Sequence, residues 1–174
     1  MTDEIEVVAG GPGDAPTLLA LFDDAVAWLV ARDQTAQWGS EPWSERPSSS
    51  ARADEWAAGG GLRFARDPGA APDALPAGAM VVGEHMPYVP PPERPELYVM
   101  VLLVNAAYRR RGVGAALIAT AEAEARAAGA EQLRVDCWAG VPGLPAQYER
   151  LGFTRTGSFE VKGWPGAILE RRLS

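Results

Sequence analysis

The chain of 174 residues carries a formal net charge of −7, which argues against nucleic-acid binding because polyphosphate affinity requires an excess of cationic surface. A chain of this length is expected to form one domain, residues 1–174, with its own hydrophobic core. One cysteine excludes an intrachain disulfide, the acidic first residues do not resemble a secretory signal, and the longest apolar run is too short for a bilayer. We therefore expect a cytoplasmic protein that binds neither nucleic acid nor a membrane.

The first half of the chain contains one long segment with helical periodicity and several short apolar segments. Gly and Pro residues separate these segments, and Asp14 is placed to cap the long helix. The predicted elements are a strand at 4–9, a helix from Asp14 to Arg32, an ordered loop at 33–50, a short helix at 51–58, and strands at 62–66 and 79–84 joined by a flexible connection at 67–78.

The strongest predicted strand, at 97–104, follows a connection at 86–95 that contains five prolines. Its apolar and β-branched composition is typical of a central strand buried on both faces. The later elements are predicted as a helix at 113–128, a strand at 132–138, a short helix at 144–151, and a terminal strand pair at 153–161 and 166–173. The order β-α-α-β-β-β-α-β-α-β-β predicts an α/β fold with a mixed central sheet.

A basic, glycine-containing turn joins the strand at 97–104 to the next helix. The first amides of a helix have no intrahelical partner and lie at the positive end of the helix dipole. Gly112 and Gly114 have no side chains to keep a phosphate from the backbone, and three arginines at 109–111 add charge-assisted hydrogen bonds. This arrangement favours a nucleotide-like anionic ligand over the alternative of a solvated basic cluster.

Two common nucleotide motifs do not fit this turn. A P-loop requires Gly-Lys-Ser/Thr at the start of the helix, where this chain has Gly114-Ala115-Ala116. The dinucleotide fingerprint requires a third glycine where Leu117 stands. Neither Mg-nucleotide chemistry nor dinucleotide binding is therefore expected.

The sequence Arg109-x-x-Gly112-x-Gly114 resembles the cofactor motif Q/R-x-x-G-x-G/A of the GNAT family of N-acetyltransferases, including its position after a strand. The resemblance implies a single-domain GNAT-like fold, acetyl-coenzyme A (acetyl-CoA) as cosubstrate and no metal. It also implies a strand that splays from its neighbour and whose backbone, at Leu102, Leu103 and Val104, holds the pantetheine arm. The implied cofactor residues of the turn, whose amides from Arg110 onward would hold the pyrophosphate, are Arg109, Arg110, Arg111, Gly112, Val113, Gly114 and Ala115.

A second segment, Tyr148-Glu149-Arg150-Leu151-Gly152-Phe153, resembles the Y-x-x-x-G-F sequence of the same family. In many members this tyrosine protonates the departing thiolate, and a phenol is neutral at pH 7 and able to donate that proton. The alternative is a core aromatic residue with its hydroxyl at the surface. One departure is Val141, which stands where many members have an asparagine that contacts the cofactor arm.

The acceptor amine must lose a proton before it attacks a thioester, because an ammonium group has no lone pair. Glu96 and Asp136, both near strand ends, are candidates for the base, and each has the alternative of a surface carboxylate. His85 is expected in a loop without a chemical role. Cys137 is expected to be a small buried hydrophobe and not an acyl-carrying nucleophile.

The implied reaction is direct acetyl transfer, in a ternary complex, to a primary amine of a small molecule or peptide. Two alternatives are the same scaffold with a larger acyl-CoA, and a non-catalytic module that binds or senses acyl-CoA. Aromatic residues early in GNAT chains often line the acceptor site, so Trp38 or Trp43 is a candidate there, with helix packing as the alternative, and Trp28 is expected in the core. A homodimer is a reasonable expectation.

Overall fold

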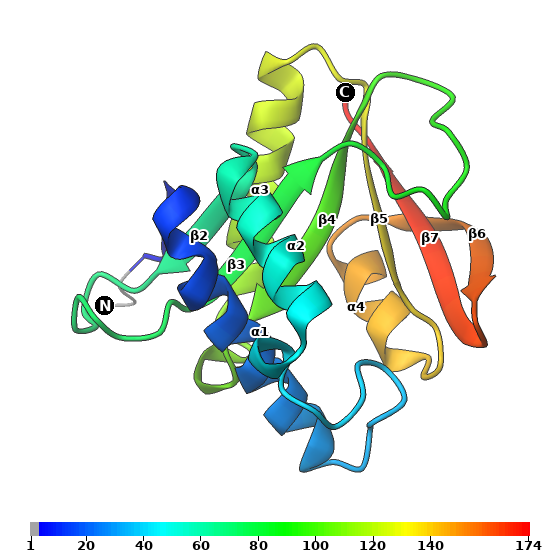
Figure 1. The fold of residues 1–174 in the computed structure, drawn as a ribbon. Helices are drawn as coiled ribbons and strands as arrows, with labels where there is room; N and C mark the ends of the chain where they lie inside the picture. Colours follow the sequence, from blue (N-terminus) through cyan, green and yellow to red (C-terminus); the bar gives the residue numbers. More distant parts are fainter. Residues whose placement is uncertain (1–3) are drawn as a thin grey trace. The chain divides into compact units, whose positions relative to one another are not determined.

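The computed structural model describes residues 4–174, and its elements follow the predicted order, with three short 3₁₀ turns added (Figure 1). The strands and helices are β1 (Glu6–Ala9), α1 (Ala15–Val30), α2 (Pro47–Ala58), β2 (Leu62–Arg66), β3 (Gly78–Gly83), β4 (Glu96–Val104), α3 (Val113–Ala127), β5 (Gln132–Trp138), α4 (Gly143–Arg150), β6 (Thr154–Val161) and β7 (Trp164–Arg172). Within the described residues the strands form one seven-stranded sheet in the order β1-β2-β3-β4-β5-β7-β6. The prediction of an α/β fold with a mixed sheet is confirmed.

The described chain divides into two compact units. The first contains the chain up to Val81 together with Val101–Leu117, and the second contains Val82–Met100 together with Ile118–Ser174. Strands β3 and β4 and helix α3 therefore each contribute residues to both units. The domain predicted over 1–174 begins three residues before the described part.

In the first unit, β1, β2 and β3 are antiparallel neighbours, and α1 buries its apolar face at Leu18, Leu21 and Phe22. Gly78 at the start of β3 allows close packing, because a Cβ there would lie 2.5 Å from the carbonyl oxygen of Leu103 and 2.8 Å from the Val113 side chain. No larger residue fits this position without moving β4 or the start of α3.

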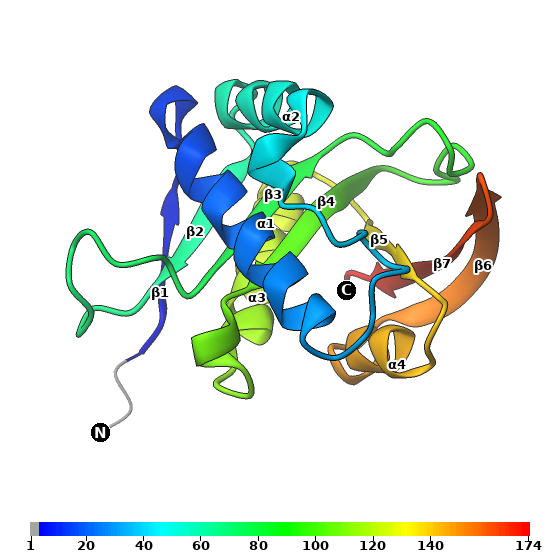
Figure 2. The same cartoon turned by 60° about the horizontal axis from the view of Figure 1, so that its bottom comes forward.

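In the second unit, β4 and β5 are parallel, and β7 pairs antiparallel with both β5 and β6 (Figure 2). A buried cluster of Val89, Tyr98 and Ile168 lies in this unit, with Met100 and Phe159 packed against it. The glycine-free connection before β4 thus supplies core residues and is more than a linker.

Two predictions about these elements are wrong. Helix α2 begins at Pro47 and not at residue 51, because proline is well suited to the first helical position and the serines that follow it are compatible with a first turn. The second concerns β4, which was expected to be buried on both faces. Alternate residues such as Val101 and Leu103 are buried, whereas Met100 and Leu102 are partly exposed, since successive side chains point to opposite sides of the sheet.

Among the described residues, no helix combines the length and the apolar composition that a membrane crossing would require.

Candidate active site

The predicted cofactor turn lies in the first unit and begins at the end of β4. Asn105, which is buried, accepts a hydrogen bond from the Ala107 amide (3.0 Å) and donates one to the carbonyl oxygen of Pro76 (3.0 Å). These bonds start a 3₁₀ turn, Ala106–Tyr108, which leads into residues 109–112 and then α3. The side chain of Asn105 therefore fixes the direction in which the chain leaves the sheet.

The turn contains two residues in the left-handed region of backbone space. Arg110 and Gly112 have positive φ angles of 63° and 78°, and nothing lies within 4 Å of a Cβ placed on Gly112. The first helical hydrogen bond joins the Ala116 amide to the Gly112 carbonyl oxygen (3.0 Å), so the amides before Ala116 have no partner inside the helix. Exposed, unobstructed amides at a helix N-terminus suit a phosphate group. The residues present therefore fit the pyrophosphate of a coenzyme.

Helix α1 holds this turn from one side. The Asp24 carboxylate accepts a hydrogen bond from the Ala106 amide (2.9 Å), and the Arg109 guanidinium lies 3.4 Å from the centre of the Trp28 ring. Arg32 lies over the same ring at 3.9 Å. Burial, and secondarily the charge of Arg32, lowers the pKa of Arg109. The expectation that Trp28 is a core residue is wrong, because it is a half-buried platform for two guanidinium groups.

The three arginines of the turn have different surroundings. The side chains of Arg110 and Arg111 are exposed. The side chain of Arg109 instead lies against the Trp28 ring, so Arg109 contributes only its backbone to the open turn. Arg111 lies 4.0 Å from Asp67, whose carboxylate accepts a hydrogen bond from the Tyr108 hydroxyl (3.0 Å). The predicted phosphate contacts of the three side chains remain predictions.

Strand β4 pairs with β5 over part of its length, and the splay that the resemblance implies remains a prediction. Its parallel register with β5 comprises four pairs, from Glu96 with Gln132 to Val99 with Val135, although β4 continues to Val104. Leu102, Leu103 and Val104 lie in the continuation. Leu103 is buried and the other two are partly exposed.

Tyr148 lies on α4 in the second unit. Its side chain is 8% exposed, and its ring meets Phe153 edge-on at 5.9 Å. Burial, with smaller contributions from Cys137 and Asp136, raises the pKa of Tyr148 well above its ordinary value. The phenol therefore stays protonated at neutral pH, as a proton donor must.

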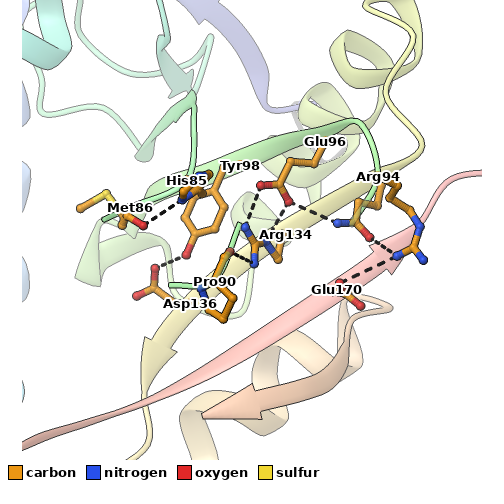
Figure 3. Close-up of polar contacts among 10 residues, drawn as sticks. His85, Met86, Pro90, Arg94, Glu96, Tyr98, Arg134, Asp136 and Glu170 are labelled. Carbon is orange, nitrogen blue, oxygen red and sulfur yellow. Dashed lines mark hydrogen bonds and ion pairs between the residues drawn. The ribbon is translucent and has the colours of Figure 1, made fainter. Parts of the chain in front are cut away.

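The two predicted base candidates have contrasting surroundings (Figure 3). Glu96 forms a two-pronged ion pair with Arg134, at 2.8 and 2.9 Å, and each side chain is only 5% exposed. Gln132 donates a further hydrogen bond to Glu96 (3.3 Å). Both oxygens of Glu96 are thus occupied by donors, and the expectation of a surface carboxylate is wrong for this residue.

Asp136 is partly buried and accepts a hydrogen bond from the Tyr98 hydroxyl (Figure 3). Burial raises the pKa of Asp136, while the Tyr98 hydrogen bond and the charge of Arg134 act in the opposite direction. Tyr98 itself is completely buried. A carboxylate that is partly desolvated and paired with a neutral donor is a better proton acceptor than an ordinary aspartate.

The remaining sequence candidates have structural surroundings. Burial raises the pKa of the Cys137 thiol to about 12, so it remains protonated and unreactive, as expected of a small buried hydrophobe. The Nδ1 atom of His85 lies 3.0 Å from the carbonyl oxygen of Met86. Trp43 stacks on Phe22 with ring centroids 3.9 Å apart, and Trp38 meets the same ring edge-on. These contacts favour packing for both tryptophans, and an acceptor role remains a prediction.

Sequence reasoning missed Tyr98 and Arg134. Both lie inside strands that were predicted, and their alternation with Glu96 and Asp136 was visible in the sequence. What the sequence does not contain is the register that places Tyr98 opposite Arg134. No group of three His, Cys, Asp or Glu side chains suited to a metal ion occurs in the part of the chain that the structure describes.

Residues 24–153 match the acetyltransferase (GNAT) family. Mycothiol acetyltransferase of Corynebacterium glutamicum (strain ATCC 13032) is 30% identical over 136 residues, which cover 77% of this chain and 42% of that protein. The mycothiol acetyltransferase of strain R matches with the same identity and coverage. The chain thus spans about two fifths of the length of the curated relatives it matches.

Solved structures share the fold at low sequence identity. A GNAT-family acetyltransferase from Listeria monocytogenes 4b F2365 is 19% identical, with a TM-score of 0.69 and coverage of 97% of this chain and 95% of that chain. The yncA protein of Salmonella typhimurium, solved with acetyl-CoA, is 16% identical with a TM-score of 0.65, over 98% and 94% of the two chains. A chain of the NatC complex bound to Gag peptide and CoA is 17% identical with a TM-score of 0.66, over 98% and 99%.

Proposed function

The chain belongs to the acetyltransferase (GNAT) family, and from this membership we propose that it transfers an acetyl group from acetyl-CoA to a primary amine. The observation that carries the proposal is the open turn at Gly112, where unpaired helix-start amides face space that a Cβ would not obstruct. The proposed pyrophosphate ligands are the amides from Arg110 to Ala115, with further charge from the exposed Arg110 and Arg111. Leu102, Leu103 and Val104 are proposed to hold the pantetheine arm through their backbone.

The proposed chemistry uses two groups of the second unit. Asp136 takes a proton from the acceptor ammonium, which frees the nitrogen lone pair for attack on the thioester carbonyl carbon. As the C–N bond forms and the C–S bond breaks, Tyr148 gives its phenolic proton to the sulfur, and the second proton of the nitrogen restores the phenol. Asp136 then releases its proton to water. The products are an N-acetyl amide, free CoA and one proton.

Asp136 is preferred to Glu96 as the base because of their surroundings. Glu96 is neutralised by Arg134 and would leave that buried cation unpaired if it accepted a proton. The only donor on the Asp136 carboxylate among the described residues is a neutral phenol, so protonation of Asp136 breaks no ion pair. Loss of a general base typically lowers the rate about 10²–10⁴-fold, which sets the expected effect of Asp136→Asn on kcat.

Titration calorimetry with acetyl-CoA tests the cofactor site. Gly112→Trp should abolish micromolar binding, because the indole fills the space that the pyrophosphate needs. Gly129→Trp is a matched control, since Gly129 has nearly the same φ (80° against 78°), also has nothing within 4 Å of its Cβ position and follows the end of α3, away from the turn. Equal losses in both variants, or no binding by the folded wild type, would contradict the proposal.

The acceptor is tested with a panel of amines. The panel contains spermidine, phenethylamine, a peptide with a free N-terminus, and the unacetylated form of mycothiol, which the Corynebacterium relatives suggest by their name. Products are identified by mass spectrometry, and butyryl-CoA in place of acetyl-CoA tests a larger acyl group. An enzyme should acetylate at least one amine.

Tyr148→Phe separates an enzyme from a protein that only binds or senses acyl-CoA. In an enzyme that uses the phenol, kcat should fall about 10²–10⁴-fold while the Kd for acetyl-CoA is unchanged. A wild type that binds acetyl-CoA, acetylates none of the amines and is indifferent to Tyr148→Phe in its ligand response would instead be a binding module.

A further inference from the structure

Tyr98 and Asp136 meet at the point where the pairing of two strands ends. Val99 and Val135 form the last register pair of β4 and β5, with Tyr98 one residue before this pair on β4 and Asp136 one residue after it on β5. The ring of Tyr98 is completely buried and packs with Val89 and Ile168. Its hydroxyl, which donates to Oδ2 of Asp136, is therefore held on a rigid support (Figure 3).

Opposing effects act on the charge of Asp136. Partial burial favours the protonated carboxyl, whereas the Tyr98 hydrogen bond and the charge of Arg134 favour the carboxylate. Of these two, the Tyr98 hydrogen bond has the larger effect, and Arg134 is itself paired with Glu96. The phenol of Tyr98 is thus the direct contact that stabilises the Asp136 carboxylate, and a protonated Asp136 cannot accept a proton from an amine.

We infer that Tyr98 is a positioning residue for the proposed acetyl transfer, and that its phenol holds the Asp136 side chain as an oriented carboxylate at the end of the β4–β5 pairing. The inference rests on the proposed function, in which Asp136 is the base. Tyr98 touches neither substrate and acts through Asp136 alone.

The other titratable groups around the pair do not supply this function. Tyr88, from the connection before β4, interacts with the Tyr98 phenol, and Cys137 and Tyr148 face Asp136 as neutral groups with raised pKa values. Arg155 on β6 acts on Cys137. Burial and the neighbouring Asp136 raise the pKa of Tyr98, so the phenol remains a donor throughout the working range.

Tyr98→Phe tests the inference, because it keeps the buried ring and removes the donor. With spermidine and phenethylamine as acceptors, the acid limb of the pH profile of kcat/KM should move to higher pH, and kcat/KM at pH 6 should fall about tenfold or more. Ser44→Ala is the matched control, since it removes a hydroxyl donor from another aspartate, Asp23 (2.5 Å), in the other unit and should leave the acid limb in place.

A second readout does not depend on turnover. The ¹³C resonance of the Asp136 carboxyl, assigned by comparison with Asp136→Asn, should titrate at higher pH in Tyr98→Phe than in the wild type. An unchanged Asp136 titration would overturn the inference, and so would a shifted titration with an unmoved acid limb. Failure of every amine in the wild type would overturn the proposed function instead, and the carboxyl titration would still decide whether Tyr98 holds Asp136 ionised.

Discussion

At the residue scale, the two carboxylates on the inner strands of the second unit have opposite environments. Glu96 is buried with a guanidinium and an amide as donors, which stabilises its charge. Asp136 is partly buried and has one neutral donor, the Tyr98 hydroxyl. Burial therefore destabilises the charge of Asp136 more than its surroundings stabilise it, and its pKa is raised. Asp136 therefore combines burial with a neutral donor, which makes it the better of the two candidates for proton transfer.

This difference predicts an effect of Asp136→Asn on stability. A carboxyl group whose pKa is raised by folding stabilises the fold fully below its unfolded pKa, about 3.9, and loses this contribution as the pH rises through its folded pKa. At pH 8 the ionised Asp136 therefore destabilises the protein, and Asp136→Asn should be as stable as the wild type or more stable, because the amide oxygen still accepts the Tyr98 hydrogen bond. The gain should disappear near pH 4.

Urea unfolding at pH 8 and pH 4 measures this effect, with Glu96→Gln as the comparison. Glu96→Gln leaves Arg134 buried without a counter-charge and should cost about 3–5 kcal/mol. A loss of stability in Asp136→Asn at pH 8 would mean that the carboxylate has a structural role and would contradict the argument.

At the element scale, two elements on either side of the cofactor turn fix its position. Helix α1 contributes Asp24 and Trp28, one helical turn apart, which hold the Ala106 amide and the Arg109 guanidinium. Strand β3 contributes Gly78, against which the end of β4 and the start of α3 pack. The open backbone at Gly112 is therefore supported by side chains outside the motif itself.

Gly78→Ala should disturb both stability and cofactor binding. The new methyl group would meet the Leu103 carbonyl oxygen and the Val113 side chain well inside van der Waals distance, so the unfolding free energy should fall by about 2 kcal/mol. The affinity for acetyl-CoA should fall with it, because both contacts flank the turn. Calorimetry and urea unfolding measure the two effects. Gly13→Ala, where a Cβ meets nothing within 4 Å, should change neither.

The element order could be predicted because it depends on local spacing. The start of a helix at residue 113 follows from the glycine turn before it and from the helical periodicity of the apolar residues after it. The supports of the turn could not be predicted, because Asp24 and Trp28 are distant in sequence and a half-exposed tryptophan has the same helical spacing as a core one. Tyr98 was missed for the same reason, since the register of parallel strands is set by packing and not by a turn.

At the scale of the whole molecule, the two compact units share three elements. Strands β3 and β4 and helix α3 pass from one unit into the other, so unfolding of either unit breaks an element of its partner. The second unit, which contains Asp136 and Tyr148, is therefore not expected to lose its strands while the first unit, which contains the cofactor turn, stays intact. We propose that residues 1–174 form one domain in the thermodynamic sense.

One cooperative transition in urea is the expected result. Four of the six tryptophans, at 28, 38, 43 and 56, lie in the first unit and report on it by fluorescence, while Cys137 lies in the second. The native thiol is buried with a pKa of about 12, whereas an unfolded cysteine has a pKa of about 8.5, so a thiol reagent at pH 8 labels the unfolded chain. Fluorescence and pulse labelling of Cys137 should have the same midpoint. Labelling at lower urea than the fluorescence change would show that the second unit unfolds by itself, because the shared elements would then fail to couple the units.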